Sequence, residues 1–108
     1  MPFTPFIEYL EFEKKYSPHT VLAYRRDLES FLEFAANGYE YSEIKTVNYA
    51  VIRSWIVSLV EQGISNRSIN RKISSLRSYY KFLLKTKQIE AHPLAKHKAL
   101  KTSKKLQV

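Results

Sequence analysis

Positively charged and hydrogen-bonding side chains recur along one face of the segment from Ser65 to about Lys87. If this segment is a helix, they share one side and apolar residues occupy the other. The polar face consists of Arg67, Asn70, Arg71, Ser74, Ser78, Lys81 and Lys85. Cations spaced along a helix can approach the phosphates of a DNA duplex, and binding then weakens with salt at a slope of about −0.9 per neutralised phosphate. Arginine and asparagine can also read base edges in the major groove.

The distribution of charge supports a polyanionic partner. The 108-residue chain has a formal net charge of +8. Residues 1–62 hold six Lys/Arg and nine Asp/Glu, a net of −3, whereas residues 63–108 hold twelve Lys/Arg and one acid, a net of +11. A face that serves only solubility predicts interspersed signs, which the second half lacks. The sequence therefore favours nucleic acid over a merely solvated face.

A second candidate anion site lies at the start of an earlier helical pattern, at Ser17-Pro18-His19-Thr20. A helix N-terminus offers free N–H groups and the positive end of the helix dipole, which suit a phosphate. Ser17, His19 and Thr20 could add side-chain donors, and Arg25 follows within two turns. The alternative is a helix cap without a ligand, and the spacing alone favours that cap.

Residues suited to other chemistry are scarce. The chain has no cysteine, so disulfides and thiolate sites are excluded. His19, His92 and His97 lack the spacing of a helix-borne metal site. None of the eight tyrosines has the neighbouring cations and acid–base partner that a nucleophile needs. We expect no catalytic residue, metal or cofactor in this chain. Without a signal peptide or a long apolar run, we expect a cytoplasmic protein that is nucleoid-associated when bound to DNA.

Four helical segments can position these side chains. The first is predicted from Thr4 to Lys15, with Thr4 as its cap and Pro5 at the first helical position. The second begins at the Ser17 cap and is expected to stop at Asn37-Gly38, where glycine would take the left-handed conformation. Its apolar positions are Val21, Leu22, Tyr24, Leu28, Phe31, Leu32 and Ala35.

The third helix is predicted after the cap Asn48 and ends at Gly63, and the fourth runs from Ser65 to about Lys87. Their buried faces are expected to be Ile52, Trp55, Ile56, Leu59 and Val60, and then Ile69, Ile73, Leu76, Tyr80, Leu83 and Leu84. The fold class is therefore all-α, a compact four-helix bundle in one domain. Residues 96–108 are lysine-rich and are predicted to be a poorly ordered basic tail.

Two stretches resemble the tyrosine recombinase, or phage integrase, family. YSPHTVLAYRRDL at 16–28, completed by Phe31, is similar to the family signature S-x-x-T-x-x-x-Y-x-x-D-L-x-x-F. SNRSINRKISSLRSYYKFL at 65–83 resembles the family's last core-binding helix, and the segment 51–63 has the spacing and closing glycine of the helix before it. The resemblance covers about residues 3–95 and is closest to the N-terminal SAM-like, or core-binding, domain of the Xer and phage-integrase branch.

The resemblance implies a domain that forms half of a clamp around duplex DNA at a recombination site. It implies residues 1–95 as the core-binding domain and 96–108 as a basic linker toward a catalytic domain that this sequence lacks. It also implies contact between the first helix and a neighbouring protomer in a synaptic tetramer. The expected DNA-binding residues are Ser17, His19, Thr20, Arg25, Asn66, Arg67, Asn70, Arg71, Ser74 and Lys81. The alternatives are a stand-alone helical DNA-binding regulator and a helical protein-interaction module.

Overall fold

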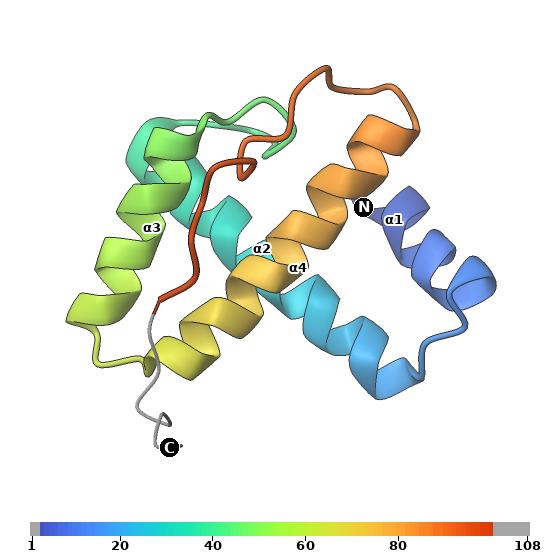
Figure 1. The fold of residues 1–108 in the computed structure, drawn as a ribbon, viewed down its shortest axis with the longest axis horizontal. Helices are drawn as coiled ribbons and strands as arrows, with labels where there is room; N and C mark the ends of the chain where they lie inside the picture. Colours follow the sequence, from blue (N-terminus) through green and yellow to red (C-terminus); the bar gives the residue numbers. More distant parts are fainter. Residues whose placement is uncertain (1–2, 101–108) are drawn as a thin grey trace.

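Two long helices, α2 (Pro18–Tyr39) and α4 (Asn66–Lys85), cross near their middles and form the frame of the domain (Figure 1). The computed structural model describes residues 3–100. On one side of the crossing lie α1 (Thr4–Glu8) and the π-helical turn η1 (Tyr9–Glu13), and on the other lies α3 (Tyr49–Glu61). Within the described residues, every regular element is helical. The predicted all-α, four-helix fold is therefore confirmed.

The core lies between the crossing helices and continues under α1 and α3. The apolar face predicted for α4 is buried at Ile69, Ile73, Leu76, Tyr80 and Leu83, and partly buried at Leu84. The predicted face of α3 is also buried, except that Val60 is 49% exposed. On α2, Leu22 is exposed, and Tyr24 and Leu32 are only half-buried. The periodicity thus located each buried stripe but misplaced its edges, since it included the exposed Leu22 and Val60 and omitted the buried Val51, Tyr79 and Phe82.

Three helix starts follow the predicted capping chemistry. The side chains of Ser17, Asn48 and Ser65 accept hydrogen bonds from the backbone N–H groups three residues later, at 3.2–3.3 Å. Each bond satisfies a donor that the first helical turn leaves without a backbone partner. These caps fix where α2, α3 and α4 begin.

The predicted Thr4 cap is wrong. Phe3 occupies the cap position, makes no side-chain cap bond and is 2% exposed. Its ring meets Tyr79 edge-on at 5.3 Å, so aromatic packing rather than a polar cap fixes the start of α1. The first segment also ends earlier than expected, because Lys15 adopts a left-handed conformation with φ of 56°.

The predicted stop of the second helix at Asn37-Gly38 is also wrong. The helix continues through Gly38 to Tyr39, and Glu40 takes the left-handed position with φ of 63°. The Tyr39 hydroxyl donates to Ser54 Oγ at 2.8 Å, and its ring packs against Phe34. These contacts hold the last turn against α3 and outweigh the cost of a helical glycine, about 1 kcal/mol.

The loop after α2 is anchored to the core. Ile44 and Val47 are buried, and the Tyr80 hydroxyl donates to the Ile44 carbonyl at 2.6 Å. Burial raises the pKa of Tyr80 above its usual value, so the hydroxyl stays protonated as the donor this bond requires. The loop between α2 and α3 is thus part of the packed structure.

The chain after α4 turns back and runs along α4 toward its N-terminal end, beside α3 (Figure 1). His92 Nε2 lies 3.1 Å from the Arg77 carbonyl, and Leu94 is fully buried. Leu100, at the end of the described residues, bonds to Asn70 on α4. The predicted poorly ordered tail therefore begins as a bound segment at 96–100, and its remainder, 101–108, lies outside the described residues. No helix of residues 3–100 has the length and apolar character to cross a bilayer.

Trp55→Ala tests the core. Trp55 is 2% exposed and its ring lies 5.0 Å from that of Phe31. The substitution is expected to lower the free energy of unfolding by about 3–5 kcal/mol, because it leaves a cavity between α2 and α3. Urea denaturation measures this. The control Val57→Ala, on the exposed side of α3, should stay within about 0.5 kcal/mol. Equal losses in the two variants would contradict the packing.

Acidification is expected to destabilise the returning segment. Desolvation lowers the pKa of both His92 and His97 from the ordinary value of 6.5. The hydrogen bond to the Arg77 carbonyl partly opposes this at His92, and the positive charge of Arg77 lowers the pKa of both histidines. Each unfolded histidine therefore binds its proton at a higher pH than the folded one, so stability is present above about pH 6.5 and is lost as the pH falls below it. We expect a lower Tm at about pH 5.5 than at about pH 7.5.

The matched control replaces both histidines. The variant His92→Gln with His97→Gln should show a smaller change in Tm between the two pH values, because its groups at these positions do not titrate. A Tm of the unchanged protein that is constant or rises on acidification would count against the predicted effect.

Candidate nucleic-acid interface

Four of the predicted site residues line one groove. His19 and Thr20 come from the first turn of α2, and Arg71 and Ser74 come from the N-terminal half of α4. The groove has a volume of about 340 Å³, and its remaining lining is Ala23, Tyr24 and Ser75. The helix crossing thus brings together two sequence motifs that lie about fifty residues apart.

A second groove lies between η1, α2 and the C-terminal half of α4. It has a volume of about 620 Å³ and contains the predicted residue Lys81 together with Lys14 and Lys85. Tyr24 lines both grooves, so they adjoin. Lys85 Nζ lies 5.1 Å from the centre of the Tyr9 ring, and Tyr16 stacks on Tyr24 at 5.8 Å. Cations and aromatic faces therefore lie next to each other.

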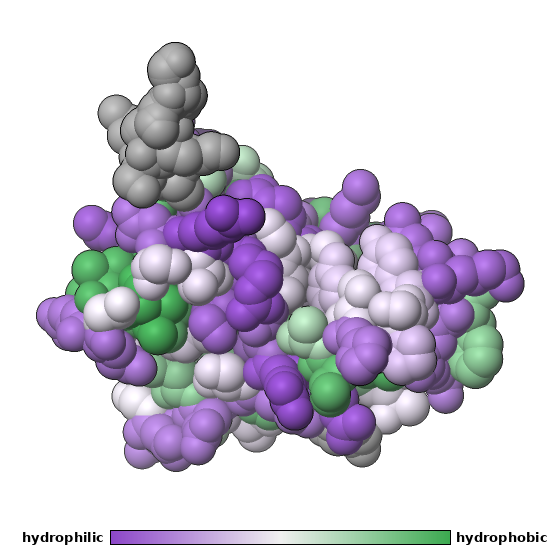
Figure 2. Space-filling model, turned by 90° about the horizontal axis from the view of Figure 1, so that it is seen from below, coloured by the Kyte–Doolittle hydropathy of each residue, from purple (hydrophilic) through white to green (hydrophobic). Residues whose placement is uncertain are grey.

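The two grooves share an electrostatic property. Their charged lining residues are Lys14, Arg71, Lys81 and Lys85, and among the described residues no carboxylate lines either groove. Seen from below, the molecule presents mainly hydrophilic side chains, with separate, small hydrophobic patches between them (Figure 2). Because the charged lining of both grooves is cationic, the grooves suit a negatively charged ligand.

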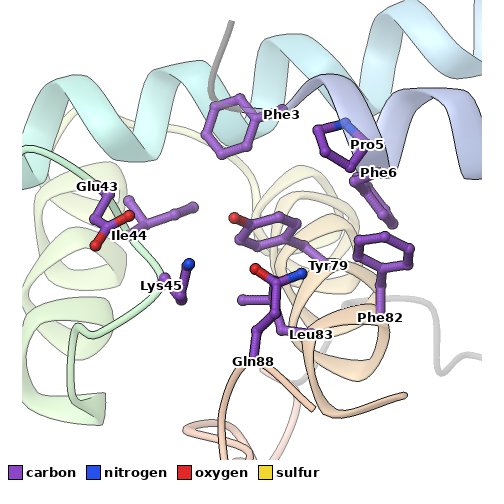
Figure 3. Close-up of a pocket in the computed structure, with 10 residues that line it drawn as sticks. All are labelled: Phe3, Pro5, Phe6, Glu43, Ile44, Lys45, Tyr79, Phe82, Leu83 and Gln88. Carbon is purple, nitrogen blue, oxygen red and sulfur yellow. The ribbon is translucent and has the colours of Figure 1, made fainter. Parts of the chain in front are cut away.

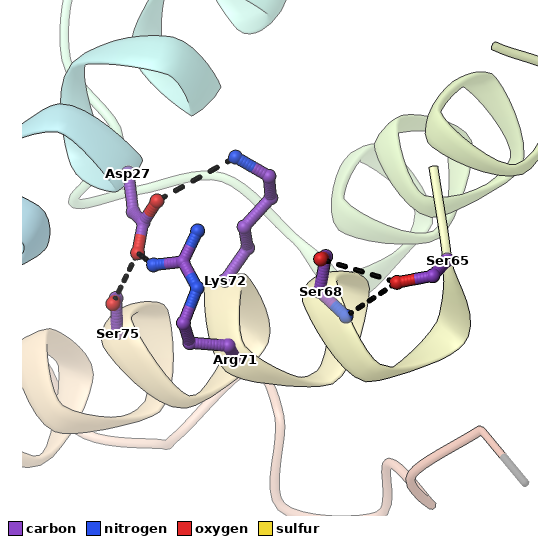
Figure 4. Close-up of polar contacts among 6 residues, drawn as sticks. All are labelled: Asp27, Ser65, Ser68, Arg71, Lys72 and Ser75. Carbon is purple, nitrogen blue, oxygen red and sulfur yellow. Dashed lines mark hydrogen bonds and ion pairs between the residues drawn. The ribbon is translucent and has the colours of Figure 1, made fainter. Parts of the chain in front are cut away.

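A buried carboxylate holds the base of the first groove. Asp27 on α2 is 3% exposed and accepts hydrogen bonds from Arg71 Nη1 at 2.8 Å and from Ser75 Oγ at 2.7 Å (Figure 4). Lys72 Nζ lies 3.6 Å from the other carboxylate oxygen. Because Arg71 keeps about half of its side chain exposed, one guanidinium can pair with Asp27 and still face the groove.

Ser17 and Ser65 act as caps. Ser17 also bonds to the Thr20 hydroxyl at 3.1 Å, and Ser65 Oγ donates to Ser68 at 3.1 Å (Figure 4). The predicted cap hydrogen bond of Ser17 is thus present. Asn66 and Arg67 are exposed on the first turn of α4 and line neither groove.

Two predicted residues have other partners. Arg25 is exposed and pairs with Glu29, four residues later on the same helix, at 3.2 Å. The half-buried Asn70 uses both groups of its carboxamide on the backbone of Leu100, with N···O distances of 2.8 and 2.9 Å. Neither side chain lines a groove.

Sequence reasoning missed Asp27 and the partners Lys72 and Ser75. A signal was present, because position 27 lies directly beside the apolar stripe of α2, where a carboxylate needs a partner. It also missed Lys14 and Lys85 as members of a shared groove, since only the fold brings η1 next to the end of α4.

A third hollow differs in character. It has a volume of about 130 Å³ and lies between α1, the loop after α2 and α4 (Figure 3). Its walls are mainly core rings such as Phe3, Phe6 and Tyr79, and Glu43 stands at its edge. Burial, with Glu43 nearby, raises the pKa of Tyr79 to about 12. None of the predicted site residues lines this hollow, and Glu43 lines it together with Lys45, so it lacks the purely cationic lining of the two grooves.

The fold and grooves define a class, a small all-helical domain in which crossed helices present cation-lined grooves. Comparison with protein families identifies the particular type. The family described as "Phage integrase, N-terminal SAM-like domain" matches residues 3–87. The chain belongs to this family, as the two sequence motifs predicted.

Three similar proteins are each named tyrosine recombinase XerC. The protein of Oceanobacillus iheyensis is 46% identical over 99 residues, covering 92% of this chain and 32% of the relative. Those of Anoxybacillus flavithermus and Bacillus subtilis are 42% and 40% identical, covering 83% and 82% of this chain and 30% and 29% of the relative. The chain thus spans about a third of the length of these relatives. No solved structure matches it.

Asp27→Ala tests the buried carboxylate. It leaves Ser75 and two cations without their shared acceptor, and the free energy of unfolding is expected to fall by about 2–4 kcal/mol. Arg71→Ala should cost less than about 1 kcal/mol, because Lys72 and Ser75 still serve Asp27 and Arg71 is half exposed. Urea denaturation of both variants gives the ranking. A larger loss for Arg71→Ala would refute it.

Proposed function

We propose that this chain is the DNA-binding core domain of a tyrosine-type site-specific recombinase and holds duplex DNA along the two adjoining grooves. The observation that carries the proposal is the convergence of the α2 and α4 motifs on grooves whose charged lining is entirely cationic. Membership of the integrase N-terminal family and the name of the relatives support the same function.

Each part of the interface has a distinct task in this proposal. Arg71 and Lys81 neutralise phosphates from the grooves, Arg67 does so from the first turn of α4, and Asn66 donates a hydrogen bond there. The N-terminus of α2, with Ser17, His19 and Thr20, receives a phosphate on its free N–H groups. Ser74 lies between these cations, and Arg25 contacts the backbone from the exposed side of α2. Phosphate contacts of this kind set position, with modest sequence preference.

The rest of the function belongs to a longer protein. We propose that the parent recombinase closes this domain and a catalytic domain around the recombination site, and that α1 contacts another protomer in the assembled tetramer. Strand cleavage is then carried by the catalytic domain, and the protein works in the cytoplasm, on the nucleoid. The C-terminal stretch from residue 96 connects the two domains along the DNA backbone.

Paired charge reversals test the interface. Arg67→Glu with Lys81→Glu should weaken binding to a DNA duplex at least about tenfold and lower the slope of log K against log salt by about 1.8, two contacts at about 0.9 each. Fluorescence anisotropy over a salt series measures both quantities. Arg71 is left unchanged because a carboxylate there would repel the buried Asp27.

The control pair is Lys45→Glu with Arg53→Glu, which makes the same change in net charge away from both grooves. It should bind almost as well as the unchanged chain. Equal weakening in the two pairs would show that only net charge matters, and unchanged binding in the first pair would exclude the grooves. If the chain binds a protein partner in a salt-insensitive way and has no affinity for duplex, a protein-interaction module is favoured.

A further inference from the structure

The Asn70 carboxamide pairs with the backbone of Leu100 as one peptide group pairs with another. Asn70 Nδ2 donates to the Leu100 carbonyl at 2.8 Å, and the Leu100 N–H donates to Asn70 Oδ1 at 2.9 Å. This pair of hydrogen bonds needs one donor and one acceptor on the same short side chain. Aspartate has no donor and alanine has neither group, so the residue type matters at this position.

The Asn70 pairing is the last of several hydrogen-bonded contacts between the C-terminal segment and the helices. His92 Nδ1 accepts from the Leu94 N–H, so its Nε2 carries the proton and donates to the Arg77 carbonyl. Arg77 in turn donates to the Leu94 carbonyl at 3.4 Å. Further along, His97 Nδ1 lies 2.8 Å from the Tyr49 hydroxyl on α3. We call residues 92–100 the strap.

The strap runs antiparallel to α4. Its first contact is at Arg77 and its last is at Asn70, two turns nearer the helix N-terminus. Leu94 is fully buried and Leu100 packs partly against the core. The last described residue, Leu100, therefore lies beside the early turns of α4, and not near the loop that follows Lys85 (Figure 1).

We propose that Asn70 is a positioning residue that binds the strap and thereby sets the point at which the chain leaves this domain. It acts through Leu100, and its carboxamide does not read bases. Only the consequence of this pairing rests on the proposed function. The segment after Leu100 then begins beside the turns of α4 that are proposed to face DNA. The pairing itself is independent of DNA.

Amide hydrogen exchange of the 108-residue chain, followed by NMR, tests the proposal. The Leu100 N–H should exchange at least about tenfold more slowly than in an unstructured peptide, since opening requires loss of its acceptor. Asn70→Ala should raise this rate about tenfold and leave the Ile73 amide of α4 unchanged. Asn70→Asp should raise it as well, because a carboxylate faces the Leu100 carbonyl. Asn66→Ala, one turn earlier, is the control and should leave Leu100 protected.

An unprotected Leu100 amide in the unchanged chain overturns the proposal, whatever the variants do. A Leu100 rate within twofold of the unchanged chain in a folded Asn70→Ala variant also overturns it. Duplex affinity separates the two roles of Asn70, since Asn70→Ala should bind within about twofold of the unchanged chain. A large loss of affinity with Leu100 still protected would make Asn70 a DNA contact. If no form of the chain binds duplex, the proposed function fails and the exchange data still decide this inference.

Discussion

The arrangement of this domain depends on one buried charge interaction at the crossing of α2 and α4. The carboxylate of Asp27 accepts hydrogen bonds from Arg71 and Ser75 and pairs with Lys72, and the residue is almost fully buried. A carboxylate in that position is tolerated only when its partners are in place, so it selects one relative placement of the two helices. The same contact orients a half-exposed guanidinium toward the groove. Fold and candidate interface therefore share a single determinant.

Much of the fold could be predicted because its signals are local. The caps Ser17, Asn48 and Ser65 and the apolar stripe of α4 act within one or two helical turns. The errors fall where distant contacts decide. Phe3 begins α1 through its packing on Tyr79, and Tyr39 extends α2 by bonding to Ser54. Neither partner lies near enough in sequence for a periodicity argument to find it.

The candidate site was predictable in composition but only partly in geometry. The resemblance placed the α2 and α4 motifs on one surface, and His19, Thr20, Arg71 and Ser74 do meet there. Helix periodicity grouped Asn70 with these residues because it describes a single helix in isolation. In the structure the strap lies on this side of α4, and the backbone of Leu100 takes up both hydrogen-bonding groups of the Asn70 carboxamide. A side chain that faces outward from its own helix can still belong to the interior of the fold.

The antiparallel course of the strap has a mechanical consequence. Tension applied to the chain beyond Leu100 reaches Asn70 and the early turns of α4 before it reaches the end of that helix. The strap must detach stepwise from Asn70, then Tyr49, then Arg77, so the load is met one attachment at a time. The helix with the cationic face thus carries the first and the last of these attachments, and α3 carries the one between them.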